Sequence, residues 1–196
     1  ILFTNQLLFK EWDAKFNLII FSLPFSKKSY LIGKFWFLYL KTSFSFLLLV
    51  LGFVIGQSLR AGSELQPEFN LWHYIYPLLV FGLLNSFFVC SFLFFIAYST
   101  NRKLLVVVGG LLLYVIYMVL LVFSNSPFMS GSTPQSLEAQ QISALSDPFG
   151  LSAYFLEAGD FSVQQKNNLI VPLSGLFLIN RTILFLLSIL FLSIGF

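Results

Sequence analysis

Four long apolar runs, separated by polar stretches, dominate the chain. They cover residues 35–56, 74–98, 104–123 and 176–196. A helix of about 20 apolar residues crosses the hydrocarbon core of a bilayer, so each run is long enough to span a membrane. Backbone N–H and C=O groups find no water there and must pair internally, which favours helices. The pattern predicts an all-α, polytopic membrane helix bundle with about four spanning helices.

The segment ahead of the first run has a different pattern. Apolar side chains recur there at helical spacing and form one stripe, made of Trp12, Phe16, Ile19, Ile20 and Leu23. Charged residues lie off this stripe, as is typical of an amphipathic helix on a surface. Pro24 is expected to end this helix because proline has no N–H. Residues 1–34 are therefore predicted to form a cytoplasmic amphipathic helix and a basic hinge, and residues 35–196 a transmembrane bundle.

The longest polar stretch, residues 124–175, lies between the third and fourth runs. Residues 124–136 are rich in Ser, Pro and Gly and predict a loop, whereas residues 137–145 and 151–158 predict short helices. Between these two helices, Asp147, Pro148, Phe149 and Gly150 form a turn signal. We expect a long external loop with short helices, because loops of this length commonly carry function or pack on the bundle.

Asn180 and Arg181 interrupt the fourth apolar run near its start. Either Arg181 marks the membrane interface, or the helix begins near Pro172 and Arg181 faces protein. The apolar residues after Arg181 are few for a full crossing, and the chain begins at Ile1 rather than Met. We therefore expect these residues to be a fragment of a longer polypeptide.

Small and polar residues within the other runs predict helix contacts. Asn85 and Ser86 lie near the middle of the second run and can hydrogen-bond to a neighbouring helix. Gly109 and Gly110 offer close helix approach in the third run. Pro77 is expected in the first turn of its helix, where proline is tolerated.

Composition strengthens the membrane assignment. Hydrophobic residues make up 58% of the chain and charged residues only 10%, against about 25% charged in a soluble domain. Basic residues gather on one side of the predicted spans, namely Lys10, Lys15, Lys27, Lys28, Lys34, Arg102 and Lys103. That side is expected to be cytoplasmic by the positive-inside rule. No other basic face exists, so no nucleic acid is expected as a partner.

Catalytic chemistry has little support in the sequence. The chain has one histidine, His73, and one cysteine, Cys90, and it contains neither an HExxH motif nor a Walker A motif. No catalytic, metal-binding or cofactor-binding residue is therefore predicted. The second and third runs also lack the buried carboxylates on which ion-driven transporters depend. A transporter of this kind would take its energy from a soluble partner.

Two stretches carry a family resemblance. EWDAKFNLIIFSLPFSKKSYLIGKF resembles the cytoplasmic segment of type-two ABC exporter permeases. DPFGLSAYF and QQKNNLIVPLSGLFLINR look like the subgroup of large bacterial permeases that are often fused to a zinc-aminopeptidase-like domain. Ser146 stands where a different small residue is usual, and Asn167 and Asn168 replace a commoner Arg-Asn-Thr pattern.

The resemblance implies a multi-pass permease of a bacterial inner membrane that exports its substrate by alternating access. It would pair with a second permease half, or with a copy of itself, and with an ABC ATPase subunit that binds the ATP. The implied ATPase-coupling segment comprises Glu11, Trp12, Asp13, Lys15, Phe16, Lys27 and Lys28. The implied family motif of the external loop comprises Asp147, Pro148, Phe149, Gly150, Pro172, Asn180 and Arg181.

Two alternatives stay open. A non-transporting membrane scaffold or sensor would use residues 124–175 to bind a partner. A membrane enzyme would need catalytic residues from parts of the chain outside this segment, such as a fused peptidase. This segment itself is expected to be a transport subunit, not an enzyme.

Overall fold

The computed structural model describes residues 2–16, 26–59, 69–124, 126 and 135–195. Every regular element within these residues is a helix. Four helices are long and apolar enough to cross a membrane, covering Lys27–Leu59, Trp72–Thr100, Lys103–Phe123 and Gly175–Gly195. The predicted all-α bundle with four spanning helices is confirmed, and the chain is a multi-pass membrane protein by this measure.

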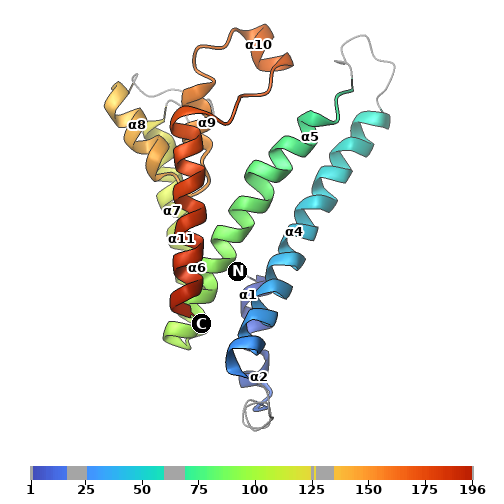
Figure 1. Cartoon of the computed structure of the whole chain (residues 1–196), viewed down its shortest axis with the longest axis vertical. Coiled ribbons are helices and arrows are strands. Elements are labelled where there is room, and N and C mark those ends of the chain that lie inside the picture. Colours follow the sequence, from blue (N-terminus) through green and yellow to red (C-terminus); the bar gives the residue numbers. More distant parts are fainter. Residues whose placement is uncertain (1, 17–25, 60–68, 125, 127–134, 196) are drawn as a thin grey trace.

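The spans run up and down alternately, so that the polar segments gather at two ends (Figure 1). The lysine-rich end holds α1 (Leu2–Leu8), α2 (Lys10–Asp13), the start of α4 (Lys27–Leu59) and the turn before α7 (Lys103–Phe123). The opposite, loop end holds, among the residues described there, the short helices α8 (Leu137–Ser146), α9 (Leu151–Glu157) and α10 (Val163–Asn168). The last span, α11 (Gly175–Gly195), returns from the loop end.

The second span is one continuous rod built from three segments. These are α5 (Trp72–Pro77), the π-helix η1 (Leu78–Leu83) and α6 (Leu84–Thr100). Because the helix already begins at Trp72, Pro77 lies beyond the first turn, and its expected placement there is wrong. Proline cannot donate the regular hydrogen bond at that position, and the wider π-helical turns follow directly after it.

Helix α4 begins earlier than the sequence pattern predicted. Lys27, Lys28 and Lys34 all lie within this 33-residue helix, so the expected hinge over these residues is wrong. The hydroxyl of Ser26 accepts a hydrogen bond from the N–H of Ser29 at 3.2 Å, which satisfies a free donor of the first turn. A serine cap therefore starts the helix ahead of the lysines.

The amphipathic helix is shorter than predicted. Helix α2 ends at Asp13, and Lys15 takes a left-handed backbone conformation with φ 53°. A non-glycine residue in this conformation does not continue a right-handed helix. The N–H of Phe16 instead closes the turn on the carbonyl of Glu11 at 2.8 Å. The remaining residues of the predicted stripe, Ile19, Ile20 and Leu23, and the predicted stop Pro24 lie outside the described residues.

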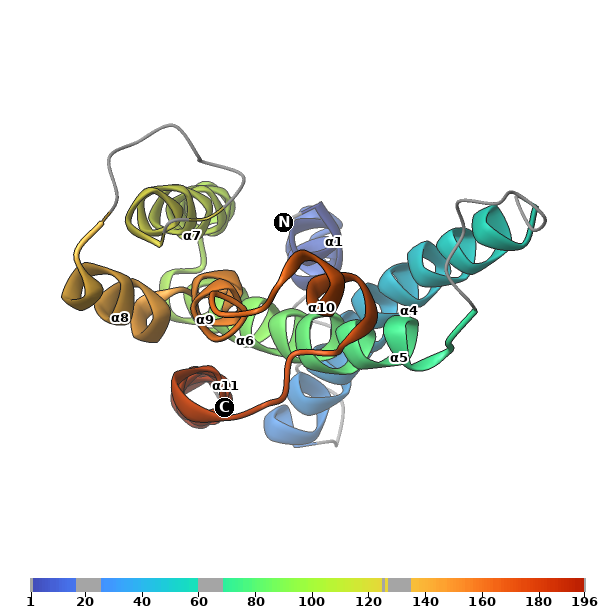
Figure 2. The ribbon, with the colours of Figure 1, turned by 90° about the horizontal axis from the view of Figure 1, so that it is seen from above.

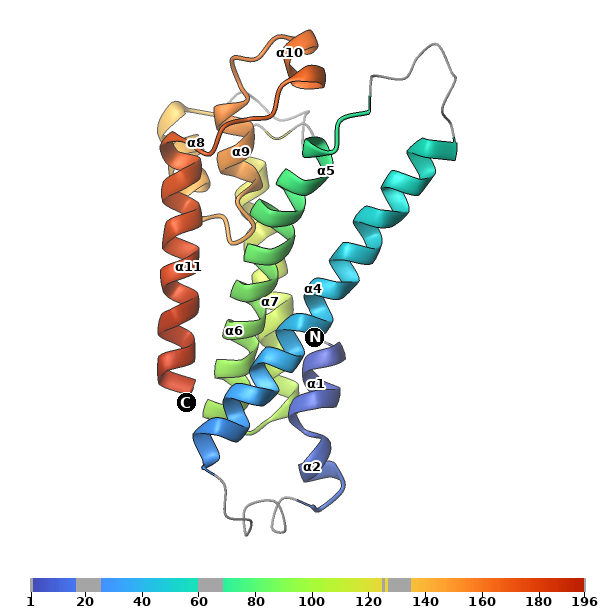
Figure 3. The same ribbon diagram turned by 45° about the vertical axis from the view of Figure 1, so that its right-hand side comes forward.

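Helix α6 is the centre of the bundle. It packs against α4, α7 and α11, and α7 and α11 lie on opposite sides of it (Figure 2). The largest core cluster lies near the lysine-rich end and consists of Leu8, Phe9, Leu31, Phe35, Leu38, Cys90, Leu93, Phe94, Ala97 and Val106. The buried residues of α4 all lie between positions 31 and 43, and towards the loop end this helix diverges from α5 (Figure 3).

Gly109 lies at the contact between α6 and α7. A Cβ atom at Gly109 would overlap the Cδ1 atom of Ile96, so the predicted close helix approach is confirmed there. The terminal methyl of Ile96 can turn away from an alanine, but a longer side chain has no room.

We predict that Gly109→Leu lowers the free energy of unfolding in detergent by about 1–3 kcal/mol, because overpacking forces α7 away from α6. Gly52→Leu is the matched control, since no atom lies within 4 Å of the Cβ position at Gly52. Thermal unfolding followed by circular dichroism measures the difference. Equal unfolding temperatures for the two variants would show that Gly109 does not set the helix spacing.

Candidate functional site

At the lysine-rich end, Glu11 joins α2 to α4. Its Oε1 accepts a hydrogen bond from the Tyr30 hydroxyl at 2.6 Å, and its Oε2 forms an ion pair with the Nζ of Lys34. The Nζ of Lys34 also donates to the carbonyl of Leu8 at 3.2 Å. Burial raises the pKa of Glu11, but the hydrogen bonds from Lys34 and Tyr30 outweigh this effect and hold it below its ordinary value of 4.5. The carboxylate is therefore charged at neutral pH and fixes α2 against the first span.

A second ion pair joins α2 to another span. The carboxylate of Asp13 bonds the ammonium of Lys103, the first residue of α7. Both side chains are about half exposed. Exposed ion pairs contribute about 0–1 kcal/mol to stability, so this contact orients α2 but adds little to the free energy that keeps it in place.

The other residues of the predicted coupling segment take no part in these bonds. Lys15 and Phe16 are exposed beyond the end of α2, and Lys27 and Lys28 are exposed in the first turn of α4. Trp12 lies within α2, and its side chain is outside the described part of the structure. The segment thus divides into a bonded part, Glu11 and Asp13, and an exposed part.

Sequence reasoning missed the partners of the bonded part. Tyr30 and Lys34 are four residues apart on α4, so they share one helix face, and that face receives Glu11. The spacing was visible in the sequence, but its pairing with a residue on a separate helix was not.

At the loop end, Asp147 organises the start of α9. This side chain is completely buried, with 0% exposure. Its Oδ1 accepts the N–H of Phe149 at 2.8 Å, and its Oδ2 accepts the N–H of Ser152 at 2.7 Å. These bonds fold the predicted turn and satisfy a free donor at the helix N-terminus, where a negative charge is favourable.

Arg181 lies on the second turn of α11 and faces protein, which decides between the two alternatives that the sequence left open. It is only 4% exposed. Its Nη1 donates to the Oδ1 of Asn85 at 2.8 Å and to the carbonyl of Val80 at 3.3 Å. The Nε and Nη2 atoms donate to the Oδ1 of Asn180 at 3.2 and 2.9 Å. The rings of Phe81 and Phe177 flank the guanidinium.

Two amide side chains fasten the turn to the spans. The Nδ2 of Asn180 donates to the carbonyls of Leu145 and Asp147 at 3.1 and 3.0 Å. The Nδ2 of Asn85 donates to the carbonyl of Phe149 at 3.0 Å. The predicted interhelical role of Asn85 is confirmed, whereas Ser86 bonds the carbonyl of Gly82 within its own helix at 2.6 Å.

Gly150 leaves the space that Arg181 fills. Its backbone is left-handed, with φ 72°, and a Cβ atom there would overlap the guanidinium. The two motif stretches, one around Asp147 and one around Asn180, therefore fit together in space. We call Asn85, Asp147, Gly150, Asn180 and Arg181 the motif cluster.

A second contact between the same motif stretches lies between the end of α9 and the start of α11. The Oε1 of Glu157 accepts the N–H of Leu176 at 3.1 Å, at the N-terminus of α11. Gly175 precedes it with φ 50°, and a Cβ atom there would overlap this carboxylate. Of the two predicted prolines of the motif, Pro148 is buried and Pro172 is exposed. Neither Glu157 nor Gly175 was identified as a site residue from the sequence.

The polar groups of the motif cluster bond one another and so hold the loop on the spans, rather than leaving a site for a ligand. Four N–H···O bonds engage the guanidinium of Arg181, and two N–H groups engage Asp147, so few donors or acceptors stay free for a ligand. Among the residues that the structure describes, no three His, Cys, Asp or Glu side chains are placed to hold a metal ion.

Comparison with known proteins gave no match to a family model, a curated protein or a solved structure. The family resemblance thus depends on the sequence motifs alone.

We predict that Gly150→Ala lowers the free energy of unfolding by about 2 kcal/mol or more. A left-handed alanine costs about 1–2 kcal/mol, and the new methyl group also displaces Arg181 from its bonds. Chemical unfolding in detergent measures the change. Gly33→Ala, within α4 and with no atom within 4 Å of its Cβ position, should not destabilise the protein, and a similar loss in both variants would contradict the packing described above.

We also predict that α2 stays on α4 at neutral pH and leaves it in acid. Because the pKa of Glu11 is lowered on folding, its contribution is fully present above 4.5 and is lost as the pH falls through the lowered value. Spin labels at Ala14→Cys and Ile32→Cys should keep one narrow distance from pH 7 to 5 and spread once the pH falls through the lowered pKa of Glu11.

Glu11→Gln should give the spread distances at every pH, whereas Asp13→Asn should keep the acid transition. A distance that does not change in Glu11→Gln would mean that other contacts position α2.

Proposed function

We propose that the chain is the membrane-spanning permease segment of an ATP-driven ABC exporter, acting in a bacterial inner membrane. A separate ATPase subunit binds and hydrolyses ATP, and this chain converts the motion of that subunit into alternating access for a substrate. The chain itself holds no cofactor in this scheme.

One observation carries the proposal. A short helix outside the spans, α2, bonds two different spans at the same end of the bundle, α4 through Glu11 and α7 through Asp13. Helix α1 adds packing against α4 and α6. A force on α2 would therefore reach three of the four spans, as a coupling helix requires.

The exposed part of the coupling segment supports a docked subunit. Phe16 is 49% exposed beside the exposed ammonium of Lys15, and Lys27 and Lys28 are exposed on the first turn of α4. Aromatic side chains are enriched in protein–protein interfaces, and the lysines around Phe16 would steer a partner with an acidic surface. The ATPase would bind here without disturbing the bonds of Glu11.

A second permease half, either another chain or a copy of this one, would complete the translocation path. The part of α4 towards the loop end supports a further contact, since it exposes large apolar side chains such as Leu49 and Phe53. Lipid covers this face wherever the second half does not.

We predict that Phe16→Glu reduces co-purification of the ATPase about tenfold or more. Losing one buried Phe side chain costs roughly 1.5–3 kcal/mol, and each 1.4 kcal/mol is a factor of ten in affinity. The chain is purified from its native membranes in mild detergent, partners with a Walker A motif are identified by mass spectrometry, and ATP hydrolysis by the complex is measured.

Val163→Glu is the matched control, because Val163 is 80% exposed at the opposite end and should leave the complex intact. If no ATPase accompanies the wild-type chain, or if Phe16→Glu keeps it, the proposal is wrong. A scaffold or sensor would instead lose its partner on deletion of residues 137–168 while ATP depletion had no effect.

A further inference from the structure

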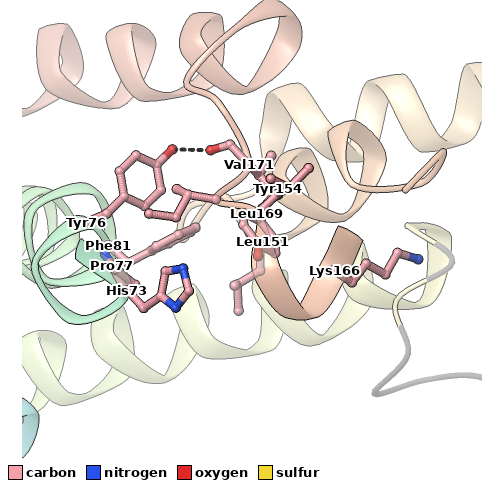
Figure 4. A pocket seen from close by; sticks show the side chains of 10 residues that line it. His73, Tyr76, Pro77, Phe81, Leu151, Tyr154, Lys166, Leu169 and Val171 are labelled. Atoms are coloured by element: carbon pink, nitrogen blue, oxygen red, sulfur yellow. Dashed lines mark hydrogen bonds between the residues drawn. The ribbon is translucent and has the colours of Figure 1, made fainter. Parts of the chain in front are cut away.

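A hollow of about 470 Å³ lies at the loop end, outside the motif cluster. Side chains of α5 and η1 form one wall, and those of α9, α10 and the segment up to Val171 form the other (Figure 4). The Tyr76 hydroxyl donates to the carbonyl of Val171 at 2.7 Å and so joins the two walls. Sites for small molecules commonly measure about 300–1,000 Å³, and this hollow has such a size.

The inside of the hollow is apolar. Pro77, Phe81, Leu151, Ile170 and Val171 contribute to its lining. The ring of Phe81 is held in place by edge-on contact with the ring of Tyr154, at 5.7 Å between centroids. An aliphatic or aromatic group could fill this space without leaving a polar atom unpaired.

The polar groups of the lining favour an anion. His73 and Lys166 both line the hollow, and neither side chain has a hydrogen bond or an ion pair within the described residues. The Nζ of Lys166 points away from the apolar side chains in Figure 4, so it lies at the rim, where its flexible stem lets it reach a bound group. No carboxylate is found among the described residues that line the hollow, so these residues do not oppose a negative charge.

A second hollow of about 410 Å³ adjoins the first, since Pro77 and Phe81 line both. It lies between η1 and the part of α4 that diverges from the bundle, and apolar residues such as Phe46, Leu49 and Val50 line it. A hydrocarbon chain whose polar end occupies the first hollow could continue into this one.

We infer that the loop end binds a single-chain amphiphile with an anionic head. The head lies between His73 and Lys166, and the apolar part lies against Phe81 and Leu151. This site goes beyond the proposed export function, because it needs neither ATP nor a partner subunit. Binding to the chain alone therefore tests it, and the outcome is independent of whether the chain is an exporter.

The test uses the full chain in phosphatidylcholine nanodiscs and a fatty acid that carries a photoactivatable diazirine near its methyl end. After illumination, labelled peptides are identified by mass spectrometry. Labels are expected on residues 46–50, 73–89 and 149–171, the segments that line the two hollows. Dodecyl phosphate should compete with the probe, whereas dodecanol and inorganic phosphate should not.

Variants test separately where the anionic head and the hydrocarbon chain of the amphiphile bind. Lys166→Ala and His73→Ala should each lower the apparent affinity by roughly two- to fivefold, as expected for one partly exposed charge or donor. Leu151→Trp should fill the first hollow and lower the affinity by about tenfold or more. Lys10→Ala, which removes an exposed lysine at the opposite end, should leave the affinity unchanged, and each variant must keep the wild-type unfolding temperature.

Three results would overturn the inference. Equal competition by dodecanol would show that the head charge is not recognised. Equal competition by inorganic phosphate would indicate a site for a free anion that does not bind a hydrocarbon chain. Unchanged labelling in both Lys166→Ala and Leu151→Trp would place the probe in bulk lipid.

Discussion

The buried guanidinium of Arg181 determines how the loop end of this protein is built. A charge inside an apolar bundle costs several kcal/mol unless hydrogen bonds and neighbouring charge compensate it. Four acceptor contacts, from Val80, Asn85 and Asn180, surround it, and the buried carboxylate of Asp147 lies near enough to interact with it electrostatically. Gly150 is needed because any side chain there would occupy the same space. If the turn between α8 and α9 left the bundle, Arg181 would lose the nearby carboxylate of Asp147, and the amides of Asn85 and Asn180 would lose carbonyl acceptors.

The two ends of the bundle are held by bonds of different strength. At the loop end, buried hydrogen bonds fasten the turn to α6 and α11, and Glu157 caps the start of α11. At the lysine-rich end, α2 is held by one partly buried and one exposed ion pair. Exposed pairs are weak and easily exchanged. The lysine-rich end is thus the one that a bound subunit could rearrange, which agrees with the coupling role proposed for α2.

Some of this structure could be predicted from patterns in the single sequence, and there are physical reasons why the rest could not. Apolar run length sufficed for the four spans, because a bilayer fixes the length that a helix needs. The same criterion failed for residues 27–34, because their lysines interrupt the apolar run and a hinge was predicted there. The Ser26 cap and the flexible lysine side chains are nevertheless compatible with a helix. The turn at Asp147 was visible, but its contact with Asn180 joins residues 33 apart in the chain, and no local pattern reports such a pair. The direction in which Arg181 points depended on where α11 begins, and Glu157, which bonds the N–H of Leu176 at that start, lies on another helix 19 residues earlier in the chain.

The account depends most directly on which face of the membrane each end occupies. Lys28→Cys and Val163→Cys place one exposed thiol at each end, and the native Cys90 is buried and should stay unlabelled. In intact cells, a membrane-impermeant maleimide should label Val163→Cys and should label Lys28→Cys only after the membrane is opened. Labelling of Lys28→Cys from outside, or of both positions from the same side, would contradict the coupling of a cytoplasmic subunit through α2.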